Sequence, residues 1–232
     1  LTTAILCAGL VGFTACDSFL DEEPKSSLTL DTYYKTSADI IGNVNYLYRD
    51  GAPDKMGNMT GAYRGSSLSV MNMVTGYFVN EYEGQEVDCS YARQLTRQDF
   101  TQSCCNYLTN DTWKSCYKSI NVANAVIKYV DGVEMDNQAQ YKAEARFFRA
   151  LNYFYLVKMF GDVPMVTEPT EDATLVEYPT RTAASEGFNT VIIPDLQFAV
   201  ENLPNATFAG NSHRVTKYAA DMLLADVYMR LG

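Results

Sequence analysis

Histidine, basic charge and long apolar runs are all scarce in this 232-residue chain. His213 is the only histidine, which argues against a histidine-based catalytic triad or a histidine-rich metal site. The 18 basic residues are outnumbered by 28 acidic ones, and a net charge of −10 repels nucleic-acid phosphates. No apolar run approaches the ~18–20 residues of a membrane-spanning helix. The composition therefore predicts a folded acidic protein with no nucleic-acid partner, and argues against a hydrolase.

The N-terminal segment has the composition of a secretory signal peptide. Residues 1–15 carry no charge and ten apolar residues, and small residues then precede Cys16 and an acidic stretch. In bacterial lipoproteins such a cysteine is acylated, and stable anchoring needs more than one acyl chain. We expect an incomplete lipoprotein signal peptide over 1–15, lipid on Cys16 and a tether over 16–35. The alternative is an ordinary cleaved signal with an unmodified cysteine.

Four cysteines remain beyond this region: Cys89, Cys104, Cys105 and Cys116. Four cysteines allow three pairings, which sequence alone does not distinguish. Cys116 falls on the core face of a predicted helix, where a buried free thiol is an adequate explanation. We expect at most one disulfide, and neither a metal site nor a cofactor.

Helical periodicity begins near Thr36 and recurs along the chain. The first stripe consists of Ala38, Ile41, Asn45 and Tyr48, with Ile40, Val44 and Leu47 alongside. The second helix is expected to begin after the capping residues 110–112, to carry Trp113, Cys116, Ile120 and Val130 on one face, and to end at Gly132 in a left-handed conformation.

The segment from about Gln138 to Phe160 is apolar on nearly all sides, which predicts a helix at the centre of a core. Its basic residues, Lys142, Arg146 and Arg149, share one narrow wedge with Tyr153. Folding would bury these charges without partners unless the wedge meets carboxylates or the carbonyl end of another helix.

Two further helices are expected, over residues 188–203 and 215–232. Pro194 lies inside the first of them and predicts a kink or a restart. Residues 142–150 and 217–225 align at an offset of 75, and an amphipathic helix precedes each of them. Two such units predict an all-α fold, a tetratricopeptide-like helical repeat scaffold with long irregular loops.

Several segments together resemble the SusD/RagB family of outer-membrane nutrient-uptake lipoproteins. Three of them are residues 16–24, 113–124 and 195–216. The most specific is the motif Glu144, Arg146, Phe147, Arg149, Ala150, Tyr153, Gly161 and Pro164. The resemblance implies a surface-exposed, lipid-anchored scaffold that binds oligosaccharides without catalysis. Its implied partner is a SusC-like TonB-dependent β-barrel transporter.

Family members are roughly twice as long, so residues 36–232 are expected to form the N-terminal helical domain, truncated before the C-terminal ligand-binding half. Arg146 and Arg149 are interpreted as structural, and Trp113 as a core residue in preference to a sugar-stacking one. Peptide binding, as in RagB-like members, or a protein-interaction scaffold is the alternative function.

The long segment Gly51–Thr112 is the predicted ligand surface, because it is tyrosine-rich and glycan-binding members often place ligand aromatics there. Aromatic rings stack on the apolar face of a sugar, while amide and charged groups bind its hydroxyls. The candidate ligand residues are Arg64, Tyr77, Asn80, Glu81 and Tyr82. Glu81 and Glu83 are carboxylates of the kind a glycosidase uses, but their spacing does not favour that reading.

Overall fold

Helices make up most of the chain that is described in the computed structural model, which covers residues 29–49, 75–77, 97–98, 103–171 and 178–232. The longer helices are α2 (Ser37–Arg49), α5 (Ser103–Tyr129), α6 (Gln138–Phe160), α8 (Ile193–Asn202) and α9 (Lys217–Leu231). Within the described ranges the only β-structure is an isolated antiparallel bridge between Val163 and Thr182. The predicted all-α class is confirmed.

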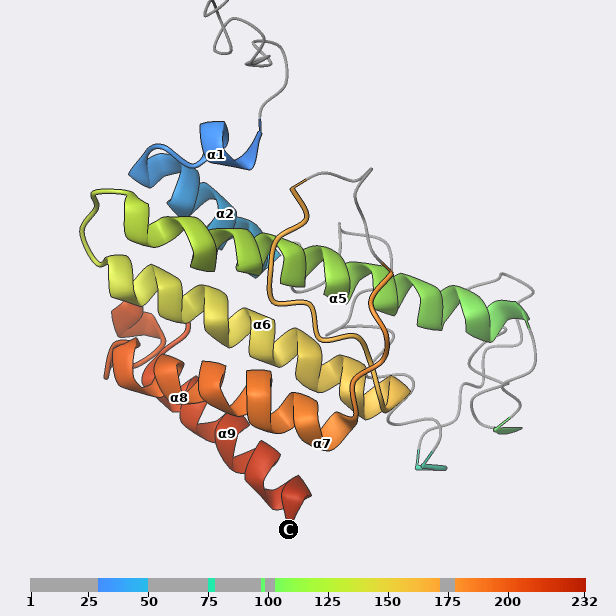
Figure 1. Ribbon diagram of the computed structural model, residues 1–232. Helices are drawn as coiled ribbons and strands as arrows, with labels where there is room; N and C mark the ends of the chain where they lie inside the picture. The colour runs from blue at the N-terminus through green and yellow to red at the C-terminus, as the bar shows by residue number, and fades with distance from the viewer. Residues whose placement is uncertain (1–28, 50–74, 78–96, 99–102, 172–177) are drawn as a thin grey trace, which may run out of the picture.

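The long helices are stacked in chain order, as Figure 1 shows: α5 packs on α6, α6 on α8 and α8 on α9, while α2 covers α5 and α6 at one end. Short elements complete the stack: α1 (Leu30–Tyr33), η1 (Val130–Gly132), α7 (Ala184–Gly187), η2 (Phe188–Ile192) and η3 (Ala209–Asn211). Packing between helices that are neighbours in sequence is what a helical-repeat scaffold requires. The tetratricopeptide-like architecture is therefore confirmed.

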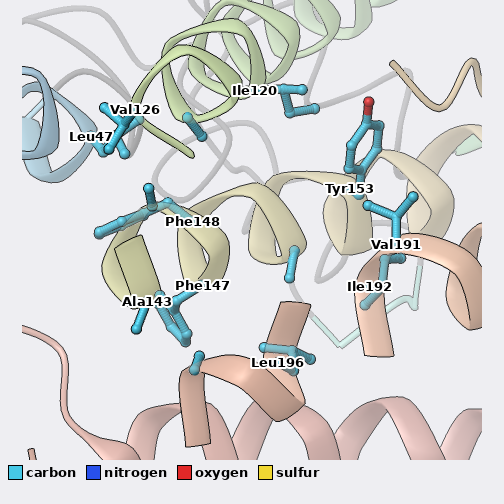
Figure 2. Close-up of a cluster of buried hydrophobic side chains, with 14 of the residues drawn as sticks. Leu47, Ile120, Val126, Ala143, Phe147, Phe148, Tyr153, Val191, Ile192 and Leu196 are labelled. Carbon is cyan, nitrogen blue, oxygen red and sulfur yellow. The ribbon is translucent and has the colours of Figure 1, made fainter. Parts of the chain in front are cut away.

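Helix α6 lies at the centre of the core, as predicted. Twelve of its residues are buried. Figure 2 shows Phe147, Phe148 and Tyr153 among buried side chains of the neighbouring helices. Fully buried alanines such as Ala145 and Ala150 present little volume, so the neighbouring helices can approach closely.

Helix α2 forms where expected, but the stripe named first for it is not its buried face. Ile40, Val44 and Leu47 are fully buried, whereas Ala38 and Asn45 are exposed. Residues at i, i+4 and i+7 share one helix face, and this is the face that packs on α5 and α6.

The folded part begins within the predicted tether. Tyr34 is buried and stacks on Tyr129 with ring centroids 5.2 Å apart. Residues 30–34 therefore belong to the helical body, although residues 16–35 were assigned to the tether.

The predicted start of α5 is wrong, and its end lies where predicted but has another conformation. The helix begins at Ser103, so residues 110–112 lie inside it and do not cap it. Asn, Asp and Thr each lower helix stability only by a fraction of a kcal/mol, so the helix can continue through them (up to about 0.7 kcal/mol per residue). The helix does end at the predicted place, but through the 3-10 turn Val130–Gly132, and Gly132 does not adopt a positive φ.

The predicted restart at Pro194 does not occur: Ile192 and Ile193 both have right-handed helical φ and ψ, and only the hydrogen-bond pattern changes there, from π to α. The π-helical residues Phe188–Ile192 lead directly into α8, which carries Pro194 in its first turn. The N–H groups in the first turn of an α-helix have no acceptor within that helix, so proline, which lacks an N–H, is tolerated there.

Candidate functional site

The site is built by a chain excursion that starts where α6 ends. Gly161 ends α6 with φ of 68°, a conformation that a residue with a Cβ rarely adopts. The described arms of the excursion, residues 163–171 and 178–182, cross α5 and α6 (Figure 1). The Val163–Thr182 bridge joins the two arms at their base.

Side chains on one face of α5 hold the first arm through its backbone. Tyr117, Asn121 and Asn124 lie at i, i+4 and i+7, so they point the same way. Their hydrogen bonds are Tyr117 Oη to Pro164 O at 2.8 Å, Asn124 Nδ2 to Val166 O at 2.9 Å and to Glu168 O at 3.2 Å, and Thr170 N to Asn121 Oδ1 at 2.8 Å. The helix sequence therefore fixes the course of a segment more than forty residues away.

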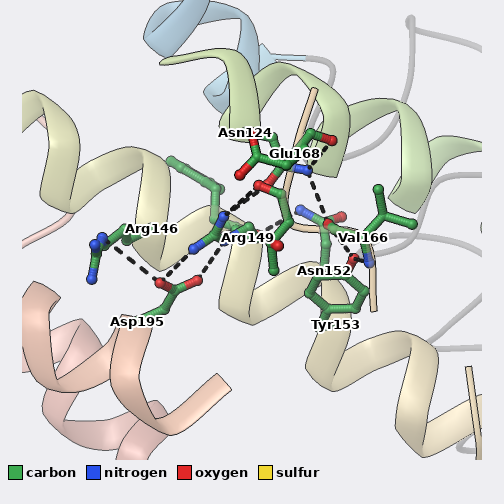
Figure 3. Close-up of polar contacts among 10 residues, drawn as sticks. Asn124, Arg146, Arg149, Asn152, Tyr153, Val166, Glu168 and Asp195 are labelled. Carbon is green, nitrogen blue, oxygen red and sulfur yellow. Dashed lines mark hydrogen bonds and ion pairs between the residues drawn. The ribbon is translucent and has the colours of Figure 1, made fainter. Parts of the chain in front are cut away.

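Tyr153 of α6 holds the middle of the same arm. Its hydroxyl donates to the carbonyl of Val166 and accepts from the Val166 N–H, both at 2.7 Å (Figure 3). Burial raises the pKa of Tyr153 far above its ordinary value, so the hydroxyl keeps its proton at neutral pH.

Below the arm, Arg149 forms a buried two-point contact with Asp195 of α8. Arg149 Nε lies 2.6 Å from Oδ2 and Nη2 lies 2.8 Å from Oδ1, while Nη1 donates to Asn124 Oδ1 at 2.9 Å (Figure 3). Arg146 Nε is 3.8 Å from Asp195, and its guanidinium covers the ring of Phe198. The prediction that the basic wedge of α6 meets carboxylates is confirmed.

The electrostatics of this cluster are those of a buried pair. Burial raises the pKa of the Asp195 carboxyl, and the hydrogen bonds and charge of Arg149 act in the opposite direction. Both side chains are almost inaccessible to solvent. The contacts of Arg149 are internal ones that join α5, α6 and α8.

Glu144 provides a second buried junction. It is fully buried, pairs with Arg214 at 2.6 Å and accepts from the Tyr48 hydroxyl at 2.9 Å. Arg214 also donates to Asn45 at 2.8 Å. This cluster joins α2, α6 and the connection before α9, so its contacts are also internal.

Between α5 and the two arms lies a groove of about 880 Å³. Trp113 and Tyr117 line it from α5, and Tyr178, a residue that is 95% exposed, lines it from the second arm. Trp113 is half-buried and packs on Phe160 with ring centroids 5.1 Å apart. Trp113 therefore contacts the core, as interpreted from the sequence, and also faces the groove.

The other end of the groove is polar. Lys128 Nζ lies 2.6 Å from Glu171 and 3.8 Å from Glu168, and the Tyr129 hydroxyl also donates to Glu171 at 3.0 Å. The hydrogen bond from Lys128 lowers the pKa of Glu171, so this carboxyl is ionised at neutral pH. Asn121 and Thr170 lie between the two ends.

This arrangement suits a sugar. Aromatic rings offer a surface for the apolar C–H face of a pyranose, and the amide and carboxylate groups can bind its hydroxyls. In the described ranges no cluster of histidine, cysteine or acidic residues could hold a metal ion. Across the same residues no helix is long and apolar enough to span a bilayer.

The predicted ligand residues stand apart from the groove or outside the described residues. Tyr77 is described and is 88% exposed, but it does not line the groove. Arg64, Asn80, Glu81 and Tyr82 lie outside the described residues, as does the predicted lipid-bearing Cys16. Cys116 is buried with a free thiol, as expected.

The predicted motif is distributed between core and groove. Phe147 and Ala150 are buried in the core, while Gly161 starts the excursion and Pro164 lines the groove. Asn121 and Asn124 had no assigned role in the sequence. An amide on the buried side of a helix needs a hydrogen-bond partner, and that need is the signal that could have revealed the arm.

Comparison with known proteins identifies relatives. The SusD-like family, described as "Starch-binding associating with outer membrane", matches residues 18–229. "SusD-like protein P2" of Formosa agariphila is 28% identical over all of this chain and 43% of its own length. The chain spans about two fifths of the length of the curated relatives it matches.

Solved structures show the same fold. A "Laminarin binding SusD-like protein" matches with a TM-score of 0.68 and 25% identity, over 84% of this chain and 40% of its own. A SusD superfamily protein from Parabacteroides distasonis matches with a TM-score of 0.62 and 26% identity, over 82% of this chain and 38% of its own.

Proposed function

The chain belongs to the SusD-like family, and on this basis we propose that it captures oligosaccharides at the cell surface and delivers them to a SusC-like TonB-dependent outer-membrane transporter. Members of the family bind carbohydrate and are not enzymes. The proposal for this chain is accordingly binding and transfer without cleavage. It involves no cofactor.

One observation of the described residues carries the glycan-binding part of the proposal. The groove along α5 combines Trp113, Tyr117 and an almost fully exposed Tyr178 with amide and carboxylate groups on the same surface. An aromatic ring that is open to solvent contributes nothing to the core. It is available to stack on a ligand.

Surface attachment is proposed to occur through lipid on Cys16, after removal of residues 1–15. The support is the uncharged apolar segment before Cys16 and the family's association with the outer membrane. We expect Cys16→Ala to abolish incorporation of labelled palmitate and to release the protein from the membrane fraction. Retention of label in Cys16→Ala would contradict lipidation at this position.

Residues 36–232 are proposed to form the N-terminal domain of a longer scaffold. Support comes from the outer face of α9, where Tyr218, Met222, Ala225 and Met229 are exposed at helix-period spacing. A repeat helix at the end of a stack ordinarily carries a polar outer face. In a longer form of the protein, peroxide should oxidise Met222 and Met229 more slowly than in the 232-residue chain, and equal rates would contradict this organisation.

Binding is tested by calorimetry of the whole chain against soluble glucans, including laminarin, and against peptide digests. Tyr178→Ala should weaken glucan binding about fivefold, the equivalent of one lost stacking contact. Phe208→Ala is the matched control, because Phe208 is an exposed aromatic residue that does not line the groove. Tyr82→Ala tests the predicted tyrosine-rich surface in parallel.

The outcomes separate the candidate functions. Saturable glucan binding that weakens with Tyr178→Ala but not with Phe208→Ala supports glycan capture in the groove. Weakening only with Tyr82→Ala would assign the site to the tyrosine-rich segment instead. Binding to peptides alone would overturn the proposal in favour of a RagB-like role, and binding to neither would favour a protein-interaction scaffold.

A further inference from the structure

We propose that the groove along α5 selects uncharged oligosaccharides of several sugar units and discriminates against acidic ones; this inference rests on the proposed glycan-binding function. The charges that line the groove and its length define this class of ligand.

The charged groups that line the groove leave no cation available for an acidic sugar. In the described part of the chain they are Lys128, Glu168 and Glu171. Lys128 is already held between the two carboxylates, at 2.6 Å from Glu171 and 3.8 Å from Glu168. A uronate or sulfate is normally bound through a charge-assisted hydrogen bond from such a cation. To supply one, Lys128 would have to leave Glu171.

A further cation, beside the aromatic end of the groove, is also engaged. The guanidinium of Arg181 lies over the ring of Trp113, 5.7 Å from its centroid, and donates to the backbone carbonyl of Asp162. The carboxylates of Glu168 and Glu171 stay at the opposite end with their side chains largely exposed. A ligand carboxylate placed there meets like charge, whereas sugar hydroxyls can donate to both glutamates.

The length of the groove favours a chain of sugars over a single one. Its lining on α5 runs from Trp113 to Lys128, and at a rise of 1.5 Å per residue these positions are about 22 Å apart along the helix. Trp113 lies at one end of this distance, and Lys128 with the two carboxylates that it contacts lies at the other. One sugar ring cannot contact both ends, so both sets of contacts require an extended oligosaccharide.

The test compares neutral and acidic ligands of matched length. Laminari-oligosaccharides, from glucose to the hexasaccharide, and oligogalacturonates of the same lengths are titrated into the whole chain at low ionic strength. The neutral series should gain affinity with length, and glucose should not bind measurably. Each uronate held near a glutamate should weaken binding about fivefold, and this difference should shrink at about 1 M salt, where the screening length is about 3 Å.

A double variant isolates the charge. Glu168→Gln with Glu171→Gln keeps the size of both side chains and should raise affinity for the galacturonates about fivefold or more, with little change for the neutral series. Glu201→Gln is the control, because Glu201 is an exposed glutamate that does not line the groove.

The outcomes distinguish this inference from the function on which it rests. Equal or tighter binding of galacturonates by the unmodified chain would overturn the selectivity and leave glycan binding intact. Weaker binding of galacturonates that the double variant does not relieve would overturn it as well, because the two glutamates would then not be the cause. If neither series binds at any length, the proposed function of the groove itself fails.

Discussion

Two carboxylate–cation clusters, one beneath the arm that crosses α5 and one that includes glutamates of the arm, have the same shortest contact and different surroundings. Arg149 and Asp195 are 2.6 Å apart and buried beneath the arm, whereas Lys128 and Glu171 are 2.6 Å apart with side chains 41% and 49% exposed at the groove. Distance alone would rank the two pairs as equal. The difference in solvent exposure separates them.

Solvent exposure separates the charges that hold the fold together from the charges that are available to a ligand. In the buried cluster the charges have lost their hydration, so each depends on its partner. At the groove, water replaces a lost partner, and exposed pairs contribute little to stability. The same chemical groups can therefore be essential for folding at one place and free to exchange partners at another.

The largest expected effect comes from breaking the buried cluster. Asp195→Ala leaves Arg149 buried without its carboxylate and should lower the free energy of unfolding by about 3–5 kcal/mol. Urea denaturation followed by circular dichroism measures this loss. Asp226→Ala is the control, since Asp226 pairs with Arg230 at 3.1 Å on an exposed helix face, and it should cost no more than about 0.5 kcal/mol. Equal losses in the two variants would show that a buried pair contributes no more to stability than an exposed one.

A smaller effect is expected where the core meets the arm. Tyr153→Phe removes the hydroxyl that makes two hydrogen bonds with Val166, and should cost about 1–3 kcal/mol by leaving the partly buried Val166 N–H unpaired. Because the arm forms one wall of the groove, the same variant should also weaken glucan binding. Loss of stability with unchanged binding would show that the arm does not depend on Tyr153 for its position.

The inner face of α5 predicts a pH dependence. Burial raises the pKa of the Cys116 thiol to about 12. Below about pH 8.5 the thiol is protonated in both folded and unfolded chains and has no effect. As the pH rises further, the unfolded chain releases this proton while the folded chain retains it, so stability falls by up to about 1.4 kcal/mol per pH unit. The stability difference between the unmodified chain and Cys116→Ala should therefore shrink between pH 9 and pH 10, and a constant difference would contradict burial of the thiol.

The smallest effect is expected at the groove. Lys128→Met should leave the midpoint of urea denaturation unchanged, because the pair with Glu171 is exposed to water. It should, however, weaken galacturonate binding further, since it removes the only cation that lines the described groove. A clear loss of stability in Lys128→Met would place this cluster with the buried one.

Sequence patterns predicted the core well because periodicity records which face of a helix is buried. They indicated a central α6 and the need of Arg146 and Arg149 for carboxylates. They failed where two outcomes differ by little local energy. The start of α5 was misplaced because residues 110–112 are good caps and also tolerable helix residues.

The groove was harder to predict. Trp113 was assigned to the core, because its position in an amphipathic helix does not reveal that one side of its ring faces a groove. The groove requires an arm that lies more than forty residues further along the chain. That arm has no periodicity of its own, because side chains of other elements hold it through its backbone.

The sequence by itself determined the helical class, the central place of α6 and the resemblance to its family, because these follow from local periodicity and from a motif of neighbouring residues. Only the tertiary structure decided that Asp195 is the partner of Arg149, that Arg214 is the partner of Glu144, and that α5 carries a groove on its outer face. The physical reason is that partner choice and concavity depend on how separate helices and an extended arm meet in space. The sequence of any one helix does not specify which residues of the other elements it will contact.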